Sequence, residues 1–150
     1  MLGNMICMLM VWISASFGYY LIAYQLKYIR GDLYINYIIS SISEIFAYLT
    51  SGIFIKFFGI RNTLLVSYII SLLGMLSIIL IKTENKILIS IFVLGGKYGV
   101  SQAFNCAYLG NIEFFPVNLL ATSYGLSNFF CRIATILAPF VAEIKPEYFS

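Results

Sequence analysis

The chain has 150 residues, of which 61% are hydrophobic and only 10% charged, and its net charge is +3. An ordinary soluble domain carries about 25% charged residues, so this composition excludes that class and predicts an integral membrane protein in a lipid bilayer. The charges form no basic run, so no nucleic-acid partner is expected. With no histidine, the usual general base and the commonest metal ligand are missing, and we expect no enzyme activity, cofactor or metal site.

Five apolar stretches are long enough to cross a bilayer, because a transmembrane helix needs about 20 predominantly apolar residues. In chain order they cover residues 5–24, 33–57, 63–81, 87–115 and 119–142. Their short polar connections favour antiparallel neighbours in one bundle. The stretches lack the alternation of barrel strands, and lipid admits no other strand architecture. We therefore expect an all-α membrane protein with five transmembrane helices.

The cysteines do not have the spacing of a metal or disulfide set. There are three of them, none in a CxxC pair, and each stands in an apolar stretch. We expect Cys7, Cys106 and Cys131 to act as small core residues.

Charged residues inside the apolar stretches are the strongest functional signal. Lys97 and Arg132 carry positive charges in the fourth and fifth stretches, and Glu44 carries a negative charge in the second. A cation at the membrane centre costs at least about 2.5 kcal/mol, so such residues usually face a bundle interior or a water-filled path. One interpretation is structural: the three charges pair and hold helices in register. We favour the other, in which they line a cavity.

Polar stripes favour the cavity interpretation, because residues three, four and seven apart share a helical face. The second stretch aligns Glu44 with Asn36, Ser40 and Ser51; the fourth aligns Lys97 with Ser101, Asn105 and Tyr108; the fifth aligns Arg132 with Asn128 and Thr135. Opposite Lys97, a ladder of small residues lets a neighbouring backbone approach closely: Gly95, Gly99, Ala103 and Ala107. The third stretch offers only Ser67, Ser71 and Gly74 among aliphatic residues, as expected of a lipid-facing support helix.

Several motifs occur in a characteristic order. Gly96-Lys97, Ala103-Phe104-Asn105-Cys106 and Glu113-Phe114-Phe115-Pro116 follow one another in the fourth stretch. This run resembles the tenth helix of the organic cation and anion transporters of the major facilitator superfamily. Trp12 with Ser16-Phe17-Gly18-Tyr19-Tyr20 resembles that family's seventh helix. Gly31-Asp32-Leu33-Tyr34-Ile35-Asn36 with Glu44 resembles its eighth. Cys131-Arg132-Ile133 with Ile136-Leu137-Ala138-Pro139-Phe140 resembles its eleventh.

The resemblance implies that residues 1–150 correspond to helices seven to eleven of a twelve-helix carrier. We therefore expect a partial C-terminal transmembrane domain, a fragment without the N-terminal half and the twelfth helix. It implies transport of a small organic ion by alternating access at the plasma membrane. The substrate would contact Arg132, Lys97, Glu44, Asn105, Asn128, Tyr19, Tyr20 and Tyr48. At the position of Arg132, cation carriers of the family resemble one another in having Asp, whereas anion carriers and some zwitterion carriers have Arg. The resemblance therefore favours an anion or zwitterion as the substrate.

A gate is implied as well. Superfamily members carry a Gly-x-x-x-Asp-Arg-x-Gly-Arg-Arg turn; here Gly52, Gly59 and Arg61 match it, while Lys56 replaces the Asp. Glu113 is expected to pair with Arg61 or Lys56, although interfacial anchoring explains these cations equally well. Membrane orientation is open, because the loop charges place the amino terminus outside and the resemblance places it inside.

Three alternatives stay open. A sugar porter of the same superfamily would show a Gln-rich seventh helix and a Gly-Pro-x-x-Trp tenth helix, and this sequence has neither. A non-transporting helix bundle, a scaffold or a relic of a larger gene, fits because half a carrier has no second half to move against. An intramembrane enzyme is the least favoured, since no nucleophile and base stand in a recognisable pattern.

Overall fold

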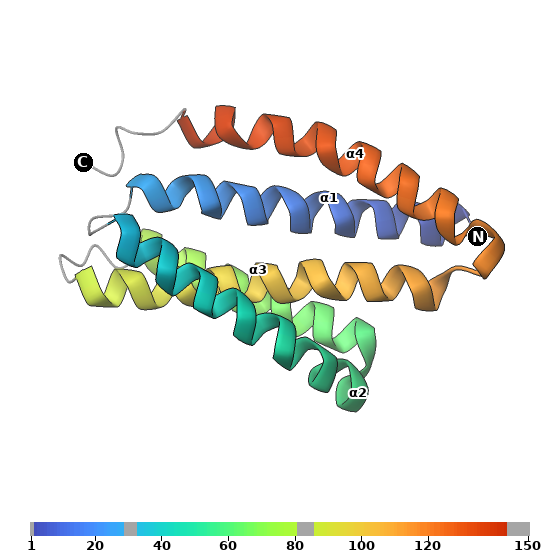
Figure 1. Ribbon diagram of the computed structural model, residues 1–150, viewed down its shortest axis with the longest axis horizontal. Coiled ribbons are helices and arrows are strands. Elements are labelled where there is room, and N and C mark those ends of the chain that lie inside the picture. Colours follow the sequence, from blue (N-terminus) through green and yellow to red (C-terminus); the bar gives the residue numbers. More distant parts are fainter. Residues whose placement is uncertain (1, 29–32, 81–85, 144–150) are drawn as a thin grey trace.

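The computed structural model describes residues 2–28, 33–80 and 86–143, and these are helical except at the connection of residues 115 and 116 (Figure 1). The helices are α1 (Leu2–Gln25), α2 (Leu33–Leu80), α3 (Lys86–Phe114) and α4 (Val117–Glu143), and the short 3-10 helix η1 (Leu26–Tyr28) follows α1. The expected all-α class is confirmed. Residue 81 of the third stretch, Gly31 and Asp32 of the eighth-helix motif, and everything after residue 143 lie outside the described residues.

Helix α2 contains both the second and the third predicted stretches, joined at Gly59. This residue has φ 78° and ψ 161°, and it is the one residue with a positive φ in the described ranges. Such a backbone conformation suits glycine, which has no Cβ to clash. The chain reverses direction there (Figure 1). We call residues 33–58 the first arm of α2 and residues 60–80 its second arm.

The connections fall at alternating ends of the bundle, as antiparallel packing requires. The amino terminus, the reversal at Gly59 and the connection from α3 to α4 lie at the same end (Figure 1). At the last of these, Pro116 accepts a hydrogen bond at its carbonyl from the Leu119 backbone N–H at 2.9 Å and starts α4. Helix α3 packs against both arms of α2 and against α1, whereas α4 packs mainly on α1.

Small residues bring the second arm of α2 unusually close to α3. A Cβ built on Gly74 would lie 2.5 Å from the Gly96 nitrogen, and one on Gly99 would lie 2.6 Å from the Ser67 carbonyl oxygen. The predicted small-residue ladder is therefore correct at Gly99 but wrong at Gly95, where a Cβ meets nothing within 4 Å. Gly96 faces the second arm instead, where a Cβ built on it would lie 3.6 Å from the Met75 sulfur.

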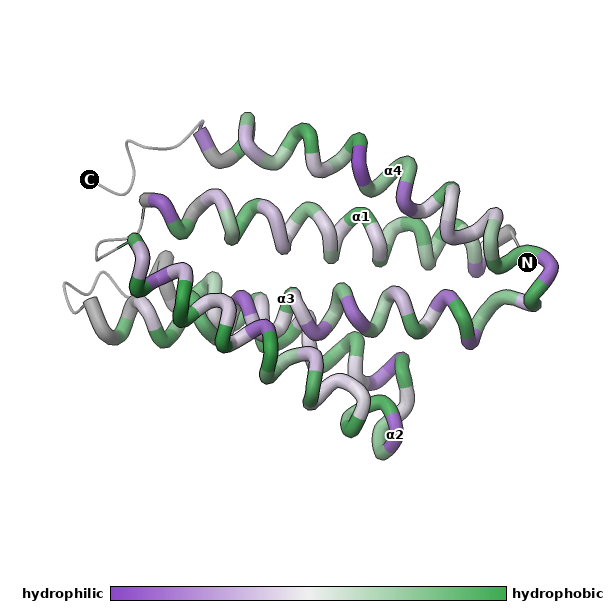
Figure 2. Tube along the Cα trace, in the orientation of Figure 1, coloured by the Kyte–Doolittle hydropathy of each residue, from purple (hydrophilic) through white to green (hydrophobic). Residues whose placement is uncertain are grey.

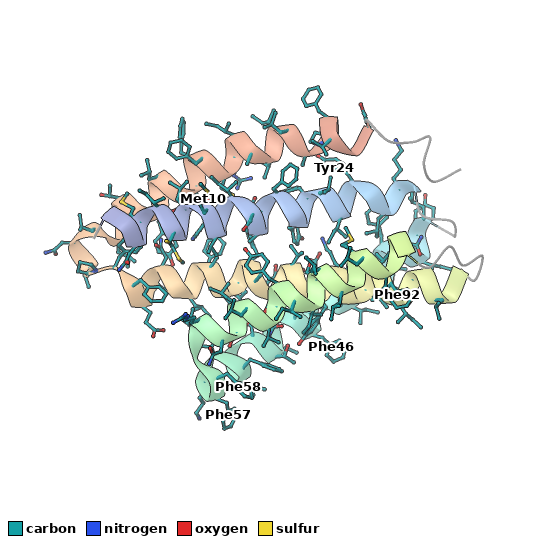
Figure 3. All side chains as sticks on the ribbon, turned by 180° about the vertical axis from the view of Figure 1, so that it is seen from behind. Met10, Tyr24, Phe46, Phe57, Phe58 and Phe92 are labelled. Atoms are coloured by element: carbon teal, nitrogen blue, oxygen red, sulfur yellow. The ribbon has the colours of Figure 1, made fainter. Side chains whose placement is uncertain are left out.

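Within the described residues, three helical segments are long and apolar enough to cross a membrane: Gly3–Tyr24, Leu33–Ser77 and Val117–Val141. Helix α3 is not one of them, and hydrophilic positions interrupt its middle (Figure 2). The outer surface of the bundle carries large exposed apolar side chains. Phe46, Phe57 and Phe58 on α2 project away from the bundle (Figure 3). This is the surface of a multi-pass protein whose solvent is lipid.

Trp12 is the centre of an aromatic core between α1, α3 and α4. It is fully buried, and its ring centroid lies 4.3 Å from that of Tyr108 and 5.8 Å from that of Tyr124. Cys106 and Cys131 are buried free thiols, as predicted, and Cys131 belongs to this core. Cys7 is also free but exposed on α1, so its predicted place in the core is wrong.

Candidate functional site

Lys97, Glu44 and Tyr19 meet inside the bundle and form what we call the Lys97 cluster. Lys97 Nζ on α3 lies 2.9 Å from Glu44 Oε1 on the first arm of α2, and the two side chains are 2% and 23% exposed. The Tyr19 hydroxyl on α1 donates to the same oxygen at 3.0 Å. The ammonium also lies 3.5 Å from the centroid of the Tyr19 ring. Three helices thus contribute one group each.

The Lys97 cluster is electrically balanced. A buried ammonium is costly unless an opposite charge and further hydrogen bonds compensate for its lost water. Glu44 supplies the charge, and the face of the Tyr19 ring attracts the cation as well. The structural interpretation of the sequence is therefore correct for Lys97 and Glu44, which pair with each other. It does not extend to Arg132.

A small cavity adjoins the Lys97 cluster. Its volume is about 10 Å³, close to the space that one water needs. Asn36 and Ser40 from α2 and Ser90 and Lys97 from α3 contribute polar groups to its lining. Asn36 Nδ2 is buried and has no hydrogen-bond partner among the described residues. The cavity is far too small for an organic substrate.

Side-chain hydrogen bonds join the first arm of α2 to α3, and the first of those below links the two predicted polar stripes. Asn105 donates through Nδ2 to Ser51 Oγ, and the hydroxyls of Thr50 and Tyr98 lie 2.6 Å apart. The Ser43 hydroxyl donates to the Leu94 carbonyl at 3.2 Å. The second-stretch and fourth-stretch stripes therefore face each other. Asn105, predicted to contact substrate, is engaged in helix packing.

Arg132 lies in a different place, in a groove between α1 and α4 that we call the Arg132 groove. This groove is open and has a volume of about 370 Å³, within the range of small-molecule sites. Its lining comprises Tyr20, Tyr24, Arg132, Thr135, Ile136, Pro139 and Phe140. No carboxylate belongs to this lining, and no ion pair engages Arg132 within the described residues. The Arg132 side chain is exposed.

The other predicted contact residues divide between these places. Tyr20 lines the Arg132 groove. Asn128 donates to the Tyr124 carbonyl of its own helix at 3.1 Å. Tyr48 is 43% exposed on the first arm of α2, outside the lining of the groove. The structure therefore does not bring Arg132 and Lys97 into one pocket.

Five residues of this lining were not among the contacts that the sequence analysis proposed: Tyr24, Thr135, Ile136, Pro139 and Phe140. Tyr24, Ile136, Pro139 and Phe140 lie one or two turns from Tyr20 or Arg132 on the same helical faces. The spacing of three, four and seven residues carried this signal. What it did not reveal was which face of α1 meets α4.

The predicted gate residues lie near one end of the bundle. Lys56 and Arg61 flank the Gly59 reversal, Glu113 lies near the end of α3, and all three side chains are exposed. A Cβ on Gly110 would lie 3.3 Å from the Ile60 side chain, so these two segments adjoin. No ion pair joins Glu113 to either cation in the described part of the chain.

Known proteins similar to the chain are organic ion transporters. Solute carrier family 22 member 16 of Xenopus laevis is 29% identical over 131 residues, 87% of this chain and 23% of the relative. Organic anion transporter 3 of Mus musculus is 28% identical over 143 residues, 93% of this chain and 27% of the relative. Organic cation/carnitine transporter 2 of Homo sapiens is 24% identical over 132 residues, 88% of this chain and 24% of the relative. The chain resembles the organic cation and anion transporters. No family model matches it.

This similarity confirms the likeness that the sequence motifs indicated. It extends over most of the chain, including α1, α3 and α4. The chain nevertheless spans only about a quarter of the length of the curated transporters it matches. Both the Lys97 cluster and the Arg132 groove belong to this quarter.

Proposed function

We propose that this chain forms most of the C-terminal half of a major facilitator carrier, which moves small organic ions by alternating access at the plasma membrane. The names of its relatives support the substrate class. The reversal at Gly59 divides α2 into two arms, so that α1, the two arms, α3 and α4 supply five helical segments. These correspond to helices seven to eleven. The N-terminal half and the twelfth helix complete the carrier.

The observation that carries the proposal is an exposed arginine in a groove that has no acidic lining. Guanidinium binds carboxylates and sulfonates through paired, charge-assisted hydrogen bonds. Tyr20 and Tyr24 on the opposite wall offer aromatic surface to the apolar part of such a substrate. A simple organic cation is repelled by Arg132, because partial exclusion of water enlarges the electrostatic effect. Anions and zwitterions are the preferred substrates.

We assign direct substrate contact to the residues that line the Arg132 groove. Most of the other candidate contact residues hold helices together instead. Lys97, Glu44 and Tyr19 satisfy one another and join α1, α2 and α3. Arg132 is therefore the cation that attracts the substrate. Asn105 joins α3 to the first arm of α2, Asn128 bonds within α4, and Tyr48 lies outside the groove.

Glu113 with Lys56 and Arg61 is proposed as the gate. These residues lie at the end where the Gly59 reversal adjoins α3. Their separation in this structure fits a state in which the gate is open. When the halves of a carrier rock, contacts at one end form while those at the other end break.

Substitution of Arg132 in the complete carrier tests this function. Arg132→Ala should raise the arylcarboxylate concentration for half-maximal uptake by about tenfold or more, because it removes the charged partner. Arg132→Lys keeps the positive charge but not the paired N–H donors of the guanidinium, so this variant should lose less affinity than Arg132→Ala. Arg132→Ala uptake equal to wild type would overturn the assignment. Neutral sugar uptake insensitive to both substitutions would favour a sugar porter.

A further inference from the structure

Helix α4 contains a proline within the Arg132 groove. Pro139 lies inside the helix and lines the groove together with Thr135. Proline has no backbone N–H, so it cannot donate to the carbonyl four residues earlier. In α4 that carbonyl belongs to Thr135. In a membrane helix, an acceptor freed in this way is satisfied by a neighbouring helix, a Ser or Thr side chain, or water.

The Thr135 side chain does not use this acceptor. Its hydroxyl donates at 2.8 Å to the Arg132 carbonyl, one turn earlier. Arg132 and Thr135 both line the groove, so the guanidinium of the first and the carbonyl of the second belong to the same stretch of α4. Helical side chains lean toward the amino-terminal end, whereas carbonyls point toward the carboxyl-terminal end. Three residues of helix separate their Cα atoms by about 4.5 Å along the axis, and the long Arg132 side chain, which leans the other way, widens the gap between the two groups.

We propose that the Thr135 carbonyl released by Pro139 is a second recognition point of the groove, which makes it selective for zwitterions carrying an N–H-bearing ammonium. The carboxylate binds Arg132, and the ammonium donates to the Thr135 carbonyl. Tyr20 and Tyr24, one turn apart on α1, line the same groove and offer ring faces to the ammonium. This inference rests on the proposed function of Arg132 and adds the identity of the second charge.

Two isosteric probes separate recognition of the ammonium from recognition of the carboxylate. They are 4-(aminomethyl)benzoate, a zwitterion, and 4-ethylbenzoate, an anion. The two have nearly the same shape, and the first carries an ammonium where the second carries a methyl group. In the complete carrier, the zwitterion should be preferred at least about tenfold, as expected of a hydrogen bond with a charged donor. Pro139→Ala restores the backbone N–H, occupies the carbonyl within the helix and should reduce this ratio to near one. A wild-type ratio near one, or a ratio that Pro139→Ala leaves unchanged, would overturn the inference.

Thr135→Ala distinguishes the carbonyl from the hydroxyl, because it removes only the latter. The preference for the zwitterion should survive this substitution even if total uptake falls; loss of the preference would assign it to the hydroxyl and overturn the inference. Should Pro139→Ala fail to fold, isotope-edited infrared spectroscopy of carbonyl-labelled threonine in the wild type replaces it. The Thr135 band should shift with 4-(aminomethyl)benzoate and not with 4-ethylbenzoate, and equal spectra would refute the contact.

The same experiment distinguishes failure of the inference from failure of the proposed function. Arg132→Ala should reduce uptake of both probes. If it reduces neither, the proposed function itself is wrong. If it reduces both while Pro139→Ala leaves the ratio unchanged, Arg132 keeps its role and only the carbonyl assignment fails.

Discussion

Lys97 Nζ and Glu44 Oε1 lie 2.9 Å apart, although they come from different helices and the lysine is almost completely enclosed. The same carboxylate oxygen accepts the Tyr19 hydroxyl at 3.0 Å. One oxygen atom therefore connects α1, α2 and α3. Neither partner of the pair can be removed without leaving the other uncompensated in a weakly polar surrounding.

The first prediction concerns this pair. Lys97→Met should lower the free energy of unfolding by about 3 kcal/mol, because it leaves Glu44 without its cation. The double variant Lys97→Met with Glu44→Gln should recover much of that loss, since no unpaired charge remains. Unfolding in mixed micelles, followed by circular dichroism, measures both. Strictly additive losses would show that the two residues do not act as a pair.

The second prediction concerns the contact between α3 and the second arm of α2. Gly99→Ala adds a Cβ that would lie only 2.6 Å from the Ser67 carbonyl oxygen and 2.6 Å from the Ser71 nitrogen. The helices must move apart, at a cost of about 1–3 kcal/mol. Gly95→Ala, on the same helix, meets nothing within 4 Å and is the matched control. Equal unfolding curves for the two variants would contradict the close approach.

A third prediction follows from the aromatic core. Trp12→Ala should destabilise the bundle by about 3 kcal/mol, because it empties a large buried site. Trp12→Phe should cost considerably less, since the indole N–H has no partner among the described residues. Met10 is 63% exposed on the same helix, so Met10→Ala should change stability by less than about 0.5 kcal/mol. Similar losses at positions 10 and 12 would place the core elsewhere.

The fourth prediction uses the three cysteines. In detergent, N-ethylmaleimide should modify exposed Cys7 at least about tenfold faster than buried Cys106 and Cys131. Peptide mass spectrometry after timed quenching gives the three rates. A Cys7→Ser variant should retain only slow modification. Rapid labelling of Cys106 in that variant would show that the packing around α3 is wrong.

The apolar stretches were enough to predict the helices, because backbone groups in lipid must be satisfied within a helix. The pairing of charges was not predictable to the same degree. Whether Glu44 pairs with Lys97 or with Arg132 depends on how α3 is rotated and which neighbours it has. That rotation is fixed by backbone contacts at Gly74, Gly96 and Gly99. Periodicity identified a small-residue face but was wrong by one residue at Gly95.

The Arg132 groove shows a similar limit. Periodicity placed Arg132 and Thr135 on one face of α4, and both line the groove. It also placed Lys97 on the polar face of α3, as the ion pair confirms. The sequence did not show that α1 separates the two faces, because helical periodicity is a property of one helix and contains no information on its neighbours.

Tyr19 and Tyr20 are consecutive residues with different surroundings. The first contacts Lys97 and Glu44, while the second lines the Arg132 groove. Consecutive side chains on a helix diverge by about 100°, so one turn of α1 carries both rings as a rigid pair. Any twist of α1 about its axis displaces the two rings in the same rotational sense. A substrate that displaces Tyr20 would therefore act, through the adjacent peptide unit, on the Tyr19 hydroxyl, which donates to the same Glu44 oxygen that Lys97 contacts.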